Sequence, residues 1–185
     1  MTFRLPAALS LMTLLLGACA QTPTITPAIA APVTATPAQT AQQLFADYWE
    51  AMLQLYPINA TYVGDNRYND QLPNFLSADF RARSKALALD WRARVAAVDT
   101  STLSEQDRLS VQMLLSDLDE ELAGYRFPSH LQPINQFYSL PNEMAQLGSG
   151  SSAQPFKTVQ DYDNWLKRAA QIPALFNQAI VNMRE

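Results

Sequence analysis

Apolar residues recur along most of the chain at intervals of three and four, the spacing of one helix face. The first such stripe predicts a helix that ends at Tyr56, because Pro57 pushes the residue before it out of the α region. A polar stretch at residues 64–70 follows, built from residues that tolerate turns. The stripe consists of Leu44, Phe45, Tyr48, Trp49, Met52, Leu53 and Tyr56.

Two further helices are predicted between residues 77 and 125. Ser77 can cap the first of them, and the capping-box pattern from Thr102 to Glu105 opens the second. Their buried faces are expected to carry Phe80, Leu87, Trp91, Val95 and Val98 in the first, and Leu114, Leu115, Leu118, Leu122 and Tyr125 in the second. We expect the acidic residues of the second helix to lie largely in water rather than around a metal; these are Asp117, Asp119, Glu120 and Glu121.

Residues 126–157 show no dominant period and contain several prolines and a Gly/Ser run, so we interpret them as a long, partly ordered loop. Thr158 caps the next helix and Asp161 completes its capping box. Pro173 either kinks that helix or starts a new one at its first position. The apolar faces are Tyr162, Trp165, Leu166 and Ala169, then Leu175, Phe176, Ile180 and Met183.

No run of period-two alternation is present, so the predicted fold is all-α, with about four to five amphipathic helices and a long Pro/Gly/Ser loop. The last stripe reaches Met183 without a Gly or Asn cap or a polar tail. That pattern favours an incomplete part of a larger helical fold.

The first residues have the features of a bacterial lipoprotein signal. Arg4 provides the positive charge, the uncharged run that follows is shorter than a membrane-spanning helix, and Leu16-Gly17-Ala18-Cys19 resembles a lipobox. We therefore expect residues 1–18 to be a signal peptide and Cys19 to carry lipid that anchors the protein in a membrane. Residues 19–38 read as a Thr/Pro/Ala-rich tether and 39–185 as the helical region, exported and held on the periplasmic side, at the outer membrane.

Composition restricts the chemistry of the 185-residue chain. A net charge of -4 argues against a nucleic-acid-binding protein. One Cys and one His cannot form an internal disulfide or a Cys/His structural zinc site.

The candidate site residues favour structural roles. His130 lacks a motif partner, so we interpret it as a hydrogen-bonding side chain rather than a catalytic base. The oxygen-bearing side chains at 65–70 lack the spacing of a calcium loop and read as a turn; they are Asp65, Asn66, Asn69 and Asp70. Four aromatic residues fit a helix core better than a peptide or sugar cleft; they are Tyr48, Trp49, Tyr62 and Tyr68.

An ordered set of short segments runs across residues 45–185. In chain order the segments are Tyr48-Trp49-Glu50, Tyr56-Pro57, Ala60-Thr61, Gly64-Asp65, Arg67 to Pro73, Leu131 to Gln136, Pro155-Phe156, Asp161-Tyr162, Leu166, Arg168 and Pro173. This set resembles the N-terminal part of the bacterial family called domain of unknown function 885.

This resemblance implies an exported or lipid-anchored protein whose more C-terminal part carries a His-Glu-x-x-Pro-Gly-His type motif, similar to zinc metallopeptidases. In such a motif two histidines bind zinc and the glutamate activates the metal-bound water. The motif does not occur in this chain. The resemblance therefore assigns no catalytic, cofactor-binding or metal-ligating residue here, and it places zinc and a peptide substrate only in a longer form.

Two functions remain open at this point. The chain is either the N-terminal helical segment of a lipid-anchored, zinc-dependent, peptidase-like hydrolase, inactive by itself, or a complete, non-enzymatic periplasmic binding or scaffold lipoprotein. In-frame coding sequence beyond Glu185 favours the first, and cooperative unfolding of an isolated 39–185 segment favours the second.

Overall fold

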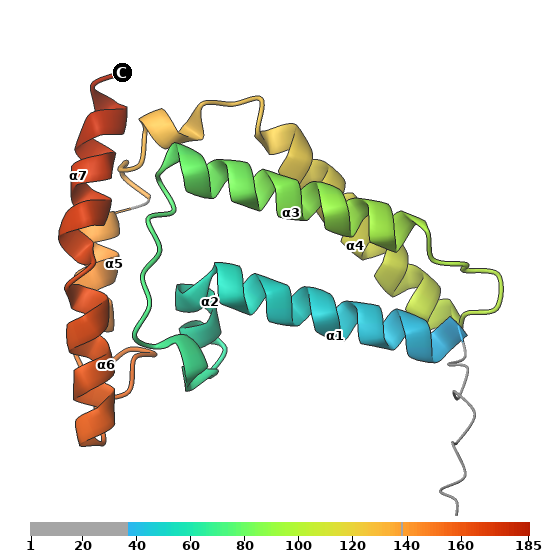
Figure 1. Cartoon of the computed structure of the whole chain (residues 1–185), viewed down its shortest axis with the longest axis horizontal. Coiled ribbons are helices and arrows are strands. Elements are labelled where there is room, and N and C mark those ends of the chain that lie inside the picture. Colours follow the sequence, from blue (N-terminus) through green and yellow to red (C-terminus); the bar gives the residue numbers. More distant parts are fainter. Residues whose placement is uncertain (1–36, 138) are drawn as a thin grey trace, which may run out of the picture. The chain divides into compact units, whose positions relative to one another are not determined.

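The computed structural model of the protein describes residues 37–137 and 139–185, which form seven α-helices, two 3-10 helices and no strand (Figure 1). The predicted all-α class is confirmed. The expected signal peptide, Cys19 and the tether up to residue 36 lie outside the described residues. The elements are α1 (Pro37–Leu55), α2 (Pro57–Tyr62), η1 (Asn66–Tyr68), α3 (Ala78–Ala96), α4 (Glu105–Gly124), η2 (Ser129–Leu131), α5 (Leu140–Leu147), α6 (Val159–Ala169) and α7 (Ile172–Met183).

Side-chain caps and prolines set most of the helix boundaries as the sequence predicts. Ser77 Oγ accepts the amide hydrogen of Phe80 at the start of α3. Thr158 and Asp161 form a complete capping box at the start of α6. Pro57 ends α1 and stands in the first turn of α2, where a missing N–H costs little. Pro173 likewise stands in the first turn of α7, so the second of its two predicted roles is the correct one.

The cap predicted at Thr102 is wrong. Ser104 caps α4 instead, accepting the Asp107 amide hydrogen at 3.1 Å. The capping pattern occurs twice in overlapping registers, from Thr102 to Glu105 and from Ser104 to Asp107. Leu103, which is buried in the core, precedes the helix and fixes the later register.

The long, partly ordered loop predicted over 126–157 contains η2 and α5, and the helix α5 was not predicted. Leu140, Met144 and Leu147 are buried at helical spacing along α5. In the sequence, Pro141 is interpreted as a residue that interrupts helices. It stands in the first turn of α5, a position that tolerates proline.

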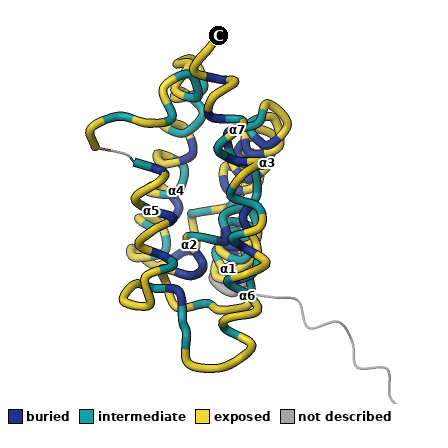
Figure 2. Tube along the Cα trace, turned by 90° about the vertical axis from the view of Figure 1, so that its left-hand side faces the viewer, coloured by how far each residue is buried: buried dark blue, intermediate teal, exposed yellow. Residues whose placement is uncertain are grey.

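Two clusters of buried apolar residues hold the described helices together, and Figure 2 shows buried positions recurring along the helices. The first joins α1, α3 and α4, with Tyr48 and Trp91 in edge contact at 5.5 Å between ring centroids. The second joins α5 and α7 to residues 69–76, which we call the strap. Gly148 ends α5 beside Trp165, where a Cβ atom would stand 2.5 Å from the indole ring. Among the described helices, none is both long and apolar enough to cross a bilayer.

The apolar face predicted for α6 and α7 is confirmed only in part. Leu175 is buried, and Trp165 and Phe176 pack against the second cluster. Tyr162, Leu166, Ile180 and Met183 are exposed. The buried positions are Arg168, Leu175, Ala179 and Asn182. The difference arises because these helices pack against the strap, whose backbone groups need hydrogen-bond partners as well as apolar contacts.

Arg168 is completely buried and binds five oxygen atoms. Its Nε donates to the carbonyl of Gln71 at 3.0 Å, and its two terminal nitrogens donate to four further oxygens at 2.7–3.4 Å. All five acceptors are uncharged. Burial lowers the pKa of Arg168 to about 10, an effect that Asp70 partly opposes. The four further acceptors are Thr61 Oγ1, Gln154 Oε1 and the carbonyls of Pro57 and Tyr68.

Two more side chains of the same helices bind the strap backbone. Gln171 donates to the carbonyl of Asp70 at 2.9 Å and accepts the amide hydrogen of Leu72 at 3.1 Å. Asn182 donates to the carbonyl of Leu76 at 2.9 Å. Together with Arg168, these residues supply partners to an irregular segment that has no regular secondary structure of its own.

An exposed ion-pair network joins α1 to η1. Arg67 contacts Glu50 and Asp65, each at 2.6 Å, and the hydroxyl of Tyr68 donates to Glu50 at 2.6 Å. The hydrogen bonds from Arg67 and Tyr68 lower the pKa of Glu50 to about 2.

We predict that Arg168→Met lowers the free energy of unfolding by about 3 kcal/mol or more, because it leaves several buried carbonyl oxygens without donors. Arg168→Lys should restore only part of the loss, since an ammonium has three donors against the five of a guanidinium. Urea unfolding of the full chain measures both. Arg184→Met, at an exposed position, is the matched control, with a change of about 0.5 kcal/mol or less. An Arg168→Met variant as stable as the unaltered chain would contradict the role of the guanidinium.

A second prediction concerns the pH dependence of the α1–η1 junction. The pKa of Glu50 is lower in the folded chain than its ordinary value of 4.5, so its contribution to stability is complete above about pH 4.5 and is lost as the pH falls toward 2. Glu50→Gln should therefore be less stable than the unaltered chain at pH 6, and the difference should disappear near pH 2. Urea unfolding between pH 2 and 6 tests this, with Glu120→Gln as the exposed control. A pH-independent difference would refute it.

Candidate functional site

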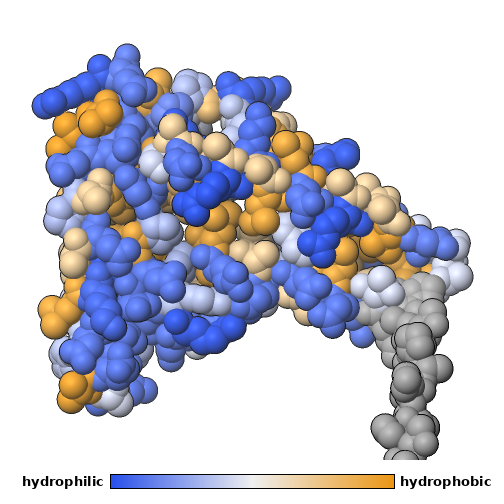
Figure 3. Space-filling view, viewed as in Figure 1, coloured by the Kyte–Doolittle hydropathy of each residue, from blue (hydrophilic) through white to orange (hydrophobic). Residues whose placement is uncertain are grey.

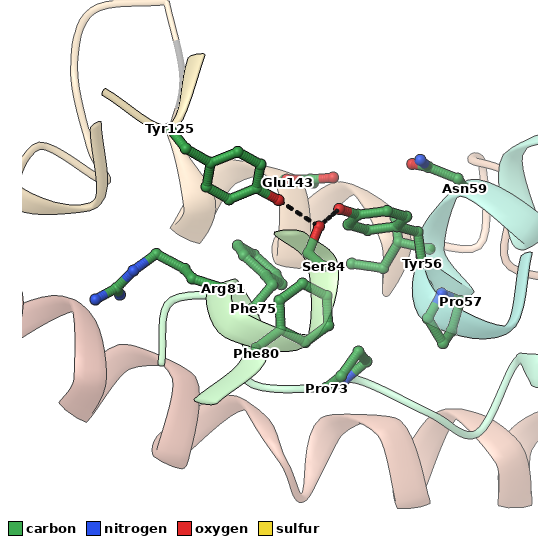
Figure 4. Close-up of a pocket in the computed structure, with 11 residues that line it drawn as sticks. Tyr56, Pro57, Asn59, Pro73, Phe75, Phe80, Arg81, Ser84, Tyr125 and Glu143 are labelled. Carbon is green, nitrogen blue, oxygen red and sulfur yellow. Dashed lines mark hydrogen bonds between the residues drawn. The ribbon is translucent and has the colours of Figure 1, made fainter. Parts of the chain in front are cut away.

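A cavity of about 320 Å³ lies where α2, the strap, α3, α5 and the end of α4 meet (Figure 4). Its wall is mostly aromatic and apolar, with a few polar groups, which is the composition of a small-molecule site. Asn59 is exposed, so the cavity reaches the surface. The lining residues are Tyr56, Pro57, Ile58, Asn59, Pro73, Phe75, Phe80, Arg81, Ser84, Tyr125 and Glu143.

Three hydroxyl groups meet at one side of the cavity. The hydroxyls of Tyr56 and Tyr125 each lie 2.7 Å from Ser84 Oγ, as Figure 4 shows. Ser84 can donate its own hydrogen to Glu121 at 3.4 Å, and Tyr125 lies 3.3 Å from the same carboxylate oxygen. Burial raises the pKa of both tyrosines, so both hydroxyls stay protonated at neutral pH.

This arrangement makes Ser84 a structural junction. Its hydroxyl can accept two hydrogen bonds and donate one, and the three neighbours occupy all of them. A serine nucleophile needs a base within hydrogen-bond reach that can take its proton. No histidine bonds to Ser84, so the geometry fits a link between the ends of α1 and α4 and the middle of α3.

Glu143 enters the cavity from α5 without a hydrogen-bond or ion-pair partner among the described residues. Burial raises the pKa of its carboxyl group. Arg81 is the one cationic residue of the lining, and its Nη1 donates to the carbonyl of Leu76 at 2.6 Å. Figure 4 shows its guanidinium turned away from the three hydroxyls.

Two neighbouring cavities adjoin this one and share lining residues with it. One of about 530 Å³ shares Phe75 and Glu143. The other, of about 390 Å³, shares Tyr56, Arg81 and Tyr125, and it also contains Glu121 and His130. His130 is half-buried, and its side chain has no hydrogen-bond partner within the described part of the chain. The structural hydrogen bond expected for it is therefore not found, and Ser84 is not bonded to it either.

The polar residues at 65–70 form a turn, as predicted. Asp65 caps η1 and pairs with Arg67, while Asn69 is buried and bonds to Thr61 and Asn66. Within residues 37–137 and 139–185, no group of three or more His, Cys, Asp or Glu side chains could hold a metal ion.

The acidic residues of α4 lie where the sequence predicts, with one exception. Asp117, Asp119 and Glu120 are exposed, and Asp119 pairs with Arg92 of α3. Glu121 is half-buried, because it faces the hydroxyls of Ser84 and Tyr125.

The four aromatic residues singled out in the sequence do not gather at the cavity. Tyr48 packs in the core as expected, and Tyr68 is half-buried against Glu50. Trp49 and Tyr62 are about half exposed, so the prediction that they lie in the core is wrong for these two.

Sequence reasoning placed Tyr56, Phe80 and Tyr125 on helix faces, but it did not predict that they line a cavity together with Phe75. Tyr56, Phe75, Phe80 and Tyr125 come from four separate segments, so no local spacing connects them. The nearest signal in the sequence is the resemblance, which includes Tyr56-Pro57.

We predict that Ser84→Ala lowers the free energy of unfolding by about 1–3 kcal/mol, because Tyr56 loses its hydrogen-bond partner and Tyr125 loses the shorter of two. Thermal and urea unfolding measure this, and Ser116→Ala at an exposed site of α4 is the control. Equal stability of the two variants would show that the three hydroxyls do not act as a junction.

Comparison with known proteins gives one family. The model of the family described as "Bacterial protein of unknown function (DUF885)" matches residues 57–185, which include the strap, Arg168 and every residue that lines the cavity except Tyr56. No curated protein and no solved structure shows significant similarity to the chain. The match covers more than half of the sequence, and the chain therefore belongs to the DUF885 family of bacterial proteins.

Proposed function

We propose that this chain is the N-terminal helical segment of a lipid-anchored, zinc-dependent, peptidase-like hydrolase. In this proposal the helices shape part of a substrate cleft, and zinc is held by residues outside this chain. Membership in the DUF885 family carries the proposal, because the resemblance places a His-Glu-x-x-Pro-Gly-His type motif in the more C-terminal part of such proteins. The chain has one histidine, so it cannot itself supply the two histidines of that motif.

An exposed apolar stripe on α6 supports a segment that packs against further protein. Val159, Tyr162 and Leu166 are 79%, 53% and 65% exposed at spacings of three and four, and Figure 3 shows apolar side chains at the surface over α6. Single exposed apolar residues are ordinary on a soluble protein, whereas a stripe along one helix face is typical of a contact surface. Ile180 and Val181 add exposed apolar area on α7.

The alternative function, a non-enzymatic binding lipoprotein, is favoured by a different observation. The cavity beside Ser84 holds an unpaired carboxylate in an aromatic wall, and its volume lies at the lower end of the range for small-molecule sites, about 300–1,000 Å³. The scaffold role has no comparable support.

We expect the full 185-residue chain to hold no zinc stoichiometrically and to cleave no peptide, because it lacks the metal-binding motif. Metal analysis after dialysis against zinc and an assay with a mixed peptide library measure both. Coding sequence beyond the codon for Glu185 is expected to continue in frame into the His/Glu motif. One tightly held zinc per chain, or a stop codon directly after Glu185, would contradict the proposal.

A further inference from the structure

We propose that the cavity beside Ser84 is a binding site for a small amine with an apolar body, whose ammonium group pairs with the carboxylate of Glu143. This proposal concerns binding alone and does not rest on the hydrolase function.

The carboxylate of Glu143 provides the first argument. It lines both this cavity and the adjoining one of about 530 Å³, and it lacks any partner among the described residues. A half-buried carboxylate without a hydrogen bond or counter-charge is costly to keep ionised. Burial raises its pKa accordingly. A ligand ammonium would supply the missing counter-charge and up to three hydrogen-bond donors.

The wall of the cavity provides the second argument. Tyr56 and Phe80 are in edge contact at 5.6 Å between ring centroids, and Phe75 lies beside Phe80 in Figure 4. Ammonium groups bind favourably over aromatic faces, and the rest of an aromatic or branched apolar ligand is buried by the same side chains. The hydroxyls of Tyr56 and Tyr125 are already hydrogen-bonded to Ser84 Oγ. The ammonium group of a ligand is therefore expected to bind Glu143 rather than these hydroxyls.

The charges around the cavity favour a cation over an anion. Arg81 is the cationic lining residue, but its guanidinium is engaged with the Leu76 carbonyl and turned away from the hydroxyl cluster. Glu121 adds a second carboxylate at the border with the cavity of about 390 Å³. The volume of about 320 Å³ limits the ligand to a small molecule.

The test uses three probes of similar size on the full, unaltered chain: 2-phenylethylamine, the neutral 2-phenylethanol and the anionic 3-phenylpropionate. Binding is measured at pH 7 by calorimetry and by chemical-shift changes of the tyrosine rings. We expect the amine to bind about tenfold or more tightly than the alcohol, as a hydrogen bond between charged groups implies. The carboxylate should bind less tightly than the alcohol.

Variants then locate the interaction. Glu143→Gln keeps the size of the side chain and should weaken amine binding about tenfold or more while leaving alcohol binding unchanged. Glu120→Gln removes the same charge from an exposed site of α4 and should change amine binding less than twofold.

The proposal is overturned if the amine does not bind at about 10 mM, if the alcohol binds equally well, if the carboxylate binds best, or if Glu143→Gln binds the amine like the unaltered chain. The probe series on the unaltered chain decides the question even if a variant fails to fold. The zinc and peptidase measurements bear on the hydrolase function only.

Discussion

The described fold depends on one buried guanidinium. Arg168 binds five uncharged oxygens that come from α2, the turn at residues 68–71 and Gln154. A buried cation without an acidic partner is expensive, and the cost is offset only if its donors are all satisfied. The guanidinium has five N–H donors, and five acceptors surround it. The three segments must therefore meet at this side chain.

The strap connects this buried charge to the cavity. Arg168, Gln171 and Asn182 bind its backbone at both ends, from Asp70 to Leu76. Pro73 and Phe75 lie between those bonds and form one wall of the cavity. The opposite wall comes from Tyr56, Ser84 and Tyr125, which are fixed by their own hydrogen bonds. The shape of the cavity thus follows from two polar clusters on either side of it.

The sequence predicts the regular helices well and the polar clusters poorly. Caps such as Ser77 and Thr158 act within four residues, so their effect can be read locally. All the bonds of Arg168 except that to Gln154 reach residues about 100 positions away, and a charged residue on a helix is ordinarily expected in water. Tyr56, Ser84 and Tyr125 are also far apart in the sequence, so local spacing does not predict their contact. The resemblance includes Thr61, Tyr68, Gln71 and Arg168, but it does not show that they touch.

The bonds from Arg168, Gln171 and Asn182 to the strap are all made to main-chain atoms. Substitutions at Pro73 or Phe75 can therefore alter the lining of the cavity while the path of the strap backbone stays the same. Ligand preference in such a protein could diversify by ordinary point mutation at these two positions, without new loops and without loss of the architecture that supports them.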